Sequence, residues 1–118
     1  MIVELVTFKS PEGWDRGQVL EDAKGVVPKW VANPDLIRKH FLLGIGEDEG
    51  TGAGLYLWPS IEAAKRVRDD AWRESVRKRT GGYPTIRYFD LLMLIDKENG
   101  SSITEYDAEG RPAAFEPA

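Results

Sequence analysis

The sequence predicts an α+β domain, because short segments rich in β-branched and aromatic residues alternate with segments whose apolar residues recur every three or four positions. The chain has 118 residues, of which 42% are hydrophobic and 31% charged, a composition typical of one globular domain. It has no cysteine, which excludes disulfides, zinc-thiolate sites, iron–sulfur clusters and thiol nucleophiles. We therefore expect a core that forms without metals or disulfides.

The first half of the chain predicts two strands and one long helix. Residues 2–9 alternate apolar and mixed positions, as in a strand, and the breakers at 10–13 end it. Residues 15–31 carry apolar residues at helical spacing, and Pro28 predicts a kink or a restart because an interior proline removes a backbone hydrogen bond. Residues 36–43 have the length and the apolar-aromatic content of a second strand.

The second half predicts a strand, a helical region and a last strand. The glycines between residues 44 and 54 predict a polar loop that runs into a short strand at 53–58. A helical region follows, in which Asp69-Asp70 resembles a second N-cap, so one helix and two shorter helices are both open. Residues 86–95 predict the fourth strand.

The remaining charges and the end of the chain predict surface features. Basic residues from Lys65 to Arg79 predict a solvated face of the helical region. Residues 97–118 are polar and hold few apolar anchors, so we expect a C-terminal arm that either packs on a partner or stays mobile. The folded domain is expected to cover residues 1–96.

The order strand, helix, strand, strand, helix, strand is the ferredoxin-like split βαβ arrangement, with the helices on one face of a four-stranded antiparallel sheet. In the third strand Leu55 and Leu57 share one side, and Tyr56 and Trp58 share the other, so both faces are too apolar for water. A second copy of the sheet can cover the bare face by two-fold symmetry. We therefore expect a homodimer.

The charge balance and the lack of long apolar runs narrow the function classes. Sixteen Lys and Arg residues against twenty Asp and Glu give a formal net charge of -4, whereas nucleic-acid-binding domains are usually basic. No apolar run approaches the length of a membrane span, and residues 1–9 lack the basic and apolar regions of a signal peptide. We expect a cytoplasmic protein that binds neither nucleic acid nor a membrane.

Three stretches of the chain carry a family resemblance. Residues 52–64 look like a third strand running into a second helix, residues 84–90 look like the approach to a last strand, and the basic strand 36–41 is similar as well. Over about residues 1–96 the chain resembles the dimeric α/β-barrel superfamily, most closely its YdhR-like and antibiotic-biosynthesis-monooxygenase-like proteins.

This resemblance implies a two-subunit α/β barrel. By analogy with characterised monooxygenase relatives, it also implies oxidation of an electron-rich phenol or anthrone by molecular oxygen, with no metal, flavin or haem. Those relatives have an active-site tryptophan at the end of the third strand, where Trp58 stands. Polyketide-tailoring members have a functional asparagine four residues earlier, and this chain has Gly54 there. The chain therefore lacks the amide that would hold a substrate carbonyl or a developing anion.

Two polar residues are candidates for acid–base chemistry. His40 is the only histidine, and with an unperturbed pKa of about 6.5 it could remove a phenolic proton; the alternative is a tolerated edge-strand residue. Glu4 is a charge in a predicted central strand, where an unpaired carboxylate would be costly. Its available partners are Arg38, His40 and Arg87, in a structural ion pair, a subunit contact or a catalytic pair.

Four aromatic residues are candidates for a pocket that orients a flat substrate, with plain core or dimer packing as the alternative: Tyr56, Trp58, Trp72 and Tyr88. We assign catalysis to His40 and Trp58. We assign substrate binding to six residues: Glu4, Arg38, Tyr56, Trp72, Arg87 and Tyr88. Strand alternation prevents all of them from sharing one cavity.

The predicted function is that of a small cofactor-independent monooxygenase acting on a phenolic, anthrone or quinone-type molecule. Two alternatives remain open at this point. A cyclase or isomerase of the same fold would need an acid–base group but no oxygen. A non-catalytic dimer that binds a small ligand would need neither.

Overall fold

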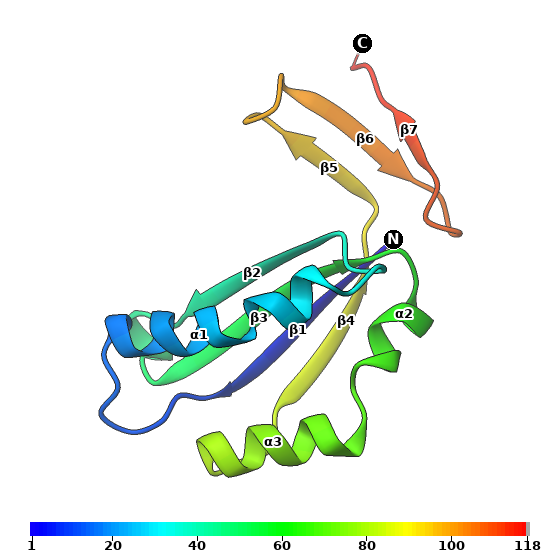
Figure 1. The fold of residues 1–118 in the computed structure, drawn as a ribbon. Coiled ribbons are helices and arrows are strands. Elements are labelled where there is room, and N and C mark those ends of the chain that lie inside the picture. Colours follow the sequence, from blue (N-terminus) through cyan, green and yellow to red (C-terminus); the bar gives the residue numbers. More distant parts are fainter. Residues whose placement is uncertain (118) are drawn as a thin grey trace.

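The computed structural model describes residues 1–117, which form a four-stranded antiparallel sheet, three helices and a second small sheet (Figure 1). The order of strands in the larger sheet is β2-β3-β1-β4. Its members are β1 (Ile2–Lys9), β2 (Arg38–Leu43), β3 (Thr51–Trp58) and β4 (Thr85–Asp90). This is the ferredoxin-like arrangement that the sequence predicts.

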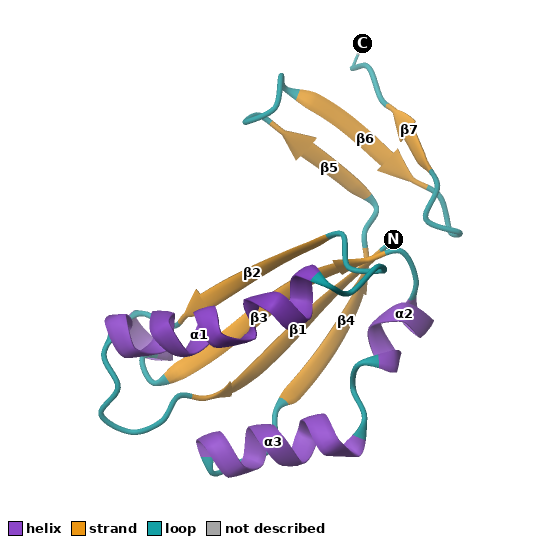
Figure 2. Ribbon diagram, in the orientation of Figure 1, coloured by secondary structure: helices purple, strands orange, loops and turns teal. Residues whose placement is uncertain are grey.

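The helices lie on one face of this sheet (Figure 2). They are α1 (Arg16–Val31), α2 (Ile61–Arg66) and α3 (Asp70–Thr80), and the loop between β2 and β3 holds a short 3-10 helix, η1 (Gly46–Asp48). No helix within residues 1–117 is long and apolar enough to cross a membrane.

Local capping sets where the helices begin. A capping box joins Asp15 and Gln18 at the start of α1, each side chain accepting from the backbone N–H of the other. The predicted restart near Pro28 is wrong, because α1 continues without a break from Arg16 to Val31. The helical region is two helices, since the Asp69 carboxylate accepts from the Trp72 backbone N–H at 2.8 Å and begins α3.

Strand register decides which side chains face the helices. Glu4 of β1 pairs with Tyr56 of β3 and with Tyr88 of β4, and Tyr56 pairs with Lys39 of β2. Side chains directly opposite one another in an antiparallel pair point to the same face. These four residues therefore lie under the helices, next to the fully buried Trp58.

The opposite face of the sheet is bare of helices. Leu55 of β3 pairs there with His40 and with Leu5, and Leu5 pairs with Arg87. Nearby Phe89 is 46% exposed. The apolar side chains of this face are thus left partly in water.

The end of the chain differs from the predicted polar arm. A second antiparallel sheet is formed by β5 (Met93–Asp96), β6 (Ser102–Tyr106) and β7 (Pro112–Ala114). The single strand predicted over 86–95 is wrong, because β4 ends at Asp90 and β5 pairs with β6. Ala118, the last residue of the expected arm, lies outside the described residues.

The second sheet projects away from the first (Figure 1). The radius of gyration is 16.0 Å, against about 13.5 Å for a compact chain of this length. The segment between β4 and β5 is bonded to the N-terminus, where the Leu91 N–H donates to the Met1 carbonyl at 2.9 Å. At Gly110, with a φ of +83°, a Cβ would lie 2.5 Å from the Met1 nitrogen, so glycine permits this close approach.

Candidate active site

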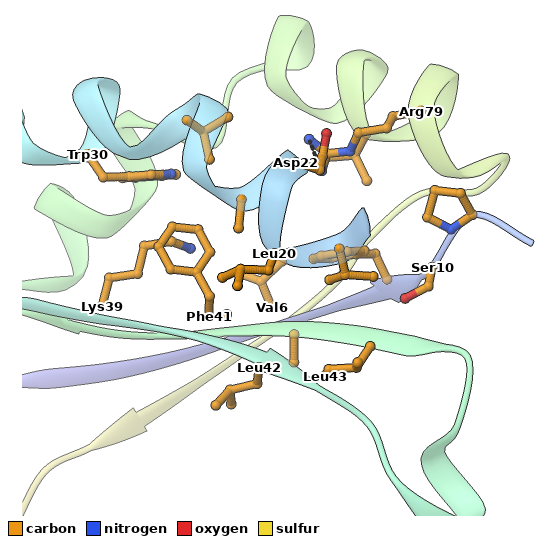
Figure 3. Close-up of a pocket in the computed structure, with 18 of the residues that line it drawn as sticks. Val6, Ser10, Leu20, Asp22, Trp30, Lys39, Phe41, Leu42, Leu43 and Arg79 are labelled. Carbon is orange, nitrogen blue, oxygen red and sulfur yellow. Dashed lines mark ion pairs between the residues drawn. The ribbon is translucent and has the colours of Figure 1, made fainter. Parts of the chain in front are cut away.

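A cavity of about 400 Å³ lies between the sheet and the helices α1 and α3. Its floor includes Lys39 and Phe41 of β2 and Tyr56 of β3, while Trp30 of α1 and Trp72 of α3 close it from above. Figure 3 shows Lys39 and Phe41 rising from β2 toward Trp30. The volume and the lining of aliphatic and aromatic side chains are those of a small-molecule site.

Lys39 is the polar group at the inner wall of this cavity. Its Nζ donates to the Tyr56 hydroxyl oxygen at 2.5 Å and lies 3.8 Å from the centroid of that ring. The ring centroids of Phe41 and Trp30 lie 4.2 and 4.9 Å from the same nitrogen. Burial, and secondly the Arg68 cation, lower the pKa of Lys39 to about 7. Near neutral pH the side chain is therefore partly a free amine, which can accept a proton.

The aromatic side chains under the helices hold one another in place. Tyr56 stacks on Trp58 with a centroid distance of 6.0 Å and an interplanar angle of 14°, and its ring centroid lies 5.1 Å from that of Trp30. Burial raises the pKa of Tyr56. Its hydroxyl thus remains protonated and available as a hydrogen-bond donor.

A buried ion pair between Glu4 and Arg68 packs against this aromatic cluster. Arg68 donates to both carboxylate oxygens of Glu4, from Nη2 to Oε1 at 2.6 Å and from Nε to Oε2 at 3.1 Å. Trp58 Nε1 donates to Glu4 Oε1 at 3.0 Å. Both charged side chains are buried, and the guanidinium lies 4.3 Å from the ring centroid of Trp72 and 4.5 Å from that of Tyr56. The pair fixes the aromatic rings that border the cavity.

This ion pair corrects two expectations. The partner of Glu4 is Arg68, because strand alternation places Arg38, His40 and Arg87 on the opposite face of the sheet. The basic residues after α2 are not all solvated either, since Arg68 stands in the break between α2 and α3 and points inward. The sequence signal that could have indicated this is that Arg68 directly precedes Asp69, the N-cap of α3, and so lies outside both helices.

The predicted site residues divide between the two faces of the sheet. Tyr56 and Trp72 line the cavity. Trp58 is fully buried and contacts Tyr56 and Glu4, so it lies behind the wall of the cavity. Tyr88 lies on the same face, where burial and then the Glu4 carboxylate raise its pKa to about 12.

Three predicted residues lie away from the cavity. Arg38, His40 and Arg87 project from the uncovered face of the sheet, and the side chain of His40 is exposed. Sequence reasoning selected His40 and missed the adjacent Lys39. Alternation along β2 could have shown that one of the two faces the helices, but only the register with Tyr56 shows which one.

The structure leaves no room for an asparagine side chain at position 54. A Cβ at this position would lie 2.7 Å from Tyr56 Cε1, 2.8 Å from the Tyr56 hydroxyl and 2.9 Å from Lys39 Nζ. The phenol and the amine therefore occupy the volume into which an asparagine side chain would project.

The charged residues around the cavity are mostly cations: Arg16, Lys29, Lys39 and Arg79, against the single acid Asp22. Asp22 of α1 and Arg79 of α3 approach to 4.0 Å and face one another (Figure 3). No group of three or more His, Asp or Glu side chains that could hold a metal lies within residues 1–117. The lining suits an anionic or acidic organic ligand.

Solved structures with the same arrangement of elements include a protein described as an antibiotic biosynthesis monooxygenase. It superposes with a TM-score of 0.56 and 17% identity, over 76% of this chain and 97% of its own. The monooxygenase from the gene ActVA-Orf6 of Streptomyces coelicolor, in complex with the ligand nanaomycin D, gives 0.56 and 22%, over 75% and 84%. The chain has the ferredoxin-like fold of the antibiotic biosynthesis monooxygenases.

The same fold also occurs in a conserved protein from Methanosarcina mazei, with a TM-score of 0.56 and 11% identity, over 75% of this chain and 91% of that one. No protein-family model and no curated protein matches the sequence. The resemblance predicted from residues 1–96 is thus confirmed at the level of the fold.

Proposed function

We propose that the protein is a small cofactor-independent monooxygenase that oxidises an aromatic molecule of the phenol, anthrone or quinone type. The observation that supports this most is a cavity of about 400 Å³ lined by aliphatic and aromatic side chains, with a desolvated amine at its inner wall, in a fold shared with proteins described as monooxygenases. The Streptomyces coelicolor monooxygenase with this fold was solved in complex with the ligand nanaomycin D.

The electron balance narrows the substrate class. Molecular oxygen accepts four electrons when one of its atoms enters a product and the other leaves as water. Oxidation of a methylene between two aromatic rings to a carbonyl releases all four, as CH₂ plus O₂ gives C=O plus H₂O. An anthrone-type methylene therefore needs no separate reductant, and we propose it as the reacting group.

The side chains that border the cavity have separable roles in this proposal. Tyr56 and Trp72 contact the flat rings of the substrate, since both line the cavity. Trp58 is a positioning residue, because it stacks on Tyr56 and donates to Glu4 without facing the cavity. Ring contacts of this kind orient the reacting carbon and exclude water.

Oxygen uptake by the purified protein tests the proposal, with a panel of anthrones, naphthols and hydroquinones. Ala23→Phe fills the cavity from α1, whereas Ala32→Phe adds the same ring at the exposed end of that helix. We expect uptake by the wild type and by Ala32→Phe, and loss in Ala23→Phe with its circular dichroism unchanged. No uptake by the wild type would instead favour a cyclase, an isomerase or a ligand-binding dimer.

We also propose that the protein is a homodimer formed through the uncovered face of the sheet. Leu5, Leu55 and Phe89 lie partly exposed there, and a two-fold axis would bury them against a second copy. The second sheet exposes Met93 and Ile95 and has no layer of its own to cover them.

Light scattering tests this assembly. A particle of twice 13.3 kDa is expected at micromolar concentration, and Leu55→Asp should convert it to a monomer because a charge would enter the buried interface. A wild-type monomer under these conditions would contradict the proposal.

A further inference from the structure

The cavity concentrates positive charge in a chain whose net charge is -4. Four of the five charged residues that line it are cations, and three of these come from the flanking helices: Arg16 and Lys29 of α1, and Arg79 of α3. Long cations at a rim can simply extend into water. Lys39 cannot do so, because it rises from the floor and three aromatic rings surround its amine.

An amine in this position lacks a carboxylate partner within the described residues around it. The nearest buried acid, Glu4, is already bound by Arg68 and Trp58. Lys39 Nζ bonds instead to the neutral Tyr56 hydroxyl. Lys39 is partly buried, and a desolvated cation without an anion is unfavourable, so the site favours either a neutral amine or a bound anion.

The glycine at position 54 makes this contact possible. With any larger residue there, a side-chain carbon would lie within 3 Å of both Lys39 Nζ and the Tyr56 hydroxyl. Gly54 therefore allows the amine and the phenol to meet at the floor of the cavity, where an oxygen atom of a bound ring could reach both.

From this geometry we infer that the cavity binds an acidic phenol, or the enol form of an anthrone, as its anion, with Lys39 as proton acceptor and counter-ion. The inference rests on the proposed function for the oxidation that follows. It names the acidic hydroxyl as the feature that the protein recognises.

The proton step is balanced within the site. The substrate O–H bond breaks, an N–H bond forms on the free amine of Lys39, and the electron pair of the broken bond stays on the substrate oxygen. The resulting ammonium pairs with that oxygen, and the Tyr56 hydroxyl donates a second hydrogen bond to it. The anion is richer in electrons than the neutral ring and gives an electron to oxygen more readily.

The proton affinity of Lys39 depends on groups from every element packed against it. These groups are Glu4 of β1, Lys29 of α1, Arg79 of α3 and Arg68 between α2 and α3, and the Tyr56 hydroxyl of β3 accepts the hydrogen bond of the amine. Three of them are cations that favour the free amine, whereas Glu4 favours the ammonium. Burial is the largest cause of the lowered pKa of Lys39, and together with these charges it lets the amine change its charge near neutral pH.

The probe for the test is 4-nitrophenol, whose phenolate absorbs visible light and whose neutral form does not. Binding is measured at a pH where free 4-nitrophenol is mostly protonated. The variants are Lys39→Met, which removes the charge, and Lys39→Arg, which keeps a permanent cation. Lys24→Met makes the same change on the exposed surface of α1 and is the matched control.

The wild type and Lys24→Met are expected to bind the probe with the phenolate spectrum, and Lys39→Arg should retain that spectrum. Lys39→Met should bind it roughly 10- to 100-fold more weakly, or in the neutral form, which corresponds to the loss of one charge-assisted hydrogen bond. Neutral probe bound to the wild type, no binding to it, or phenolate binding by Lys39→Met with the affinity of the wild type would each overturn the inference.

Oxygen uptake separates this inference from the proposed function. With an anthrone, uptake by the wild type should rise with pH through a transition near 7, and Lys39→Arg should lose this transition, because a guanidinium does not change its charge near neutral pH. Phenolate binding without oxygen uptake on any substrate would support the anion site and refute the proposed monooxygenase activity. Equal uptake by the wild type and Lys39→Met would refute the role of Lys39 alone.

Discussion

Removal of Arg68 tests the buried ion pair that supports the cavity. In Arg68→Met the Glu4 carboxylate loses both guanidinium contacts, at 2.6 and 3.1 Å, and keeps only the Trp58 N–H in a site without exposure to water. Breaking a buried pair in this way costs about 3–5 kcal/mol. With an unfolding entropy of about 0.25 kcal/mol/K for a chain of this length, the melting temperature should fall by about 12–20 °C.

Urea denaturation of a double-mutant cycle measures the pair itself. Glu4→Gln should also be destabilised, because it leaves the Arg68 cation buried without an anion. The double variant should be more stable than the sum of the two losses predicts, by at least about 2 kcal/mol. Arg66→Met breaks an exposed pair with Asp35 at 3.1 Å and should lose less than about 1 kcal/mol. A similarly small loss in Arg68→Met, or simple additivity in the cycle, would refute the reasoning.

Three further predictions concern stability. Lys39 has a folded pKa of about 7, below its value in the unfolded chain, so between about pH 7 and 10 the unfolded state binds more protons. Wild-type stability should therefore rise with pH relative to Lys39→Met, by up to about 1.4 kcal/mol per pH unit, and parallel pH curves from urea denaturation would contradict this. The free energy of unfolding of Gly54→Ala should be about 1–3 kcal/mol lower than that of the wild type, because the added Cβ would lie 2.7 Å from Tyr56 Cε1. Gly25→Ala has open space in α1 and should gain about 0.5–1 kcal/mol in the same denaturation assay; equal effects of the two would count against the crowding at position 54. The free energy of unfolding of Asp69→Ala should be about 1 kcal/mol lower than that of the wild type, because the variant loses the N-cap of α3. An unchanged free energy of unfolding would contradict this role of the cap.

Local signals predicted most of the larger sheet and its helices. The apolar spacing over 15–31 indicated α1, and the acidic pair at Asp69 indicated the start of α3, because helix periodicity and caps depend on residues close in sequence. The break between β4 and β5 was missed, since Leu91 and Leu92 continue the apolar run of β4 and hide its end at Asp90. A strand break without Gly or Pro gives no clear local signal.

The candidate site was less predictable than the fold. The sequence indicated that Glu4 needs a partner, and it indicated an aromatic pocket around Tyr56 and Trp72, both of which line the cavity. It favoured His40 as the base because the unperturbed pKa of histidine lies near neutrality. That argument omits burial, which lowers the pKa of Lys39 into the same range.

The sequence by itself determined the α+β class, the order of the main elements, the absence of cysteine chemistry and the resemblance to a monooxygenase fold. Only the tertiary structure decided that Arg68 pairs with Glu4, that Lys39 faces the cavity while His40 faces away, and that a second sheet follows β4. The first set depends on contacts a few residues apart. The second depends on strand register and on burial, and a shift of one residue in register would exchange the two faces of every strand.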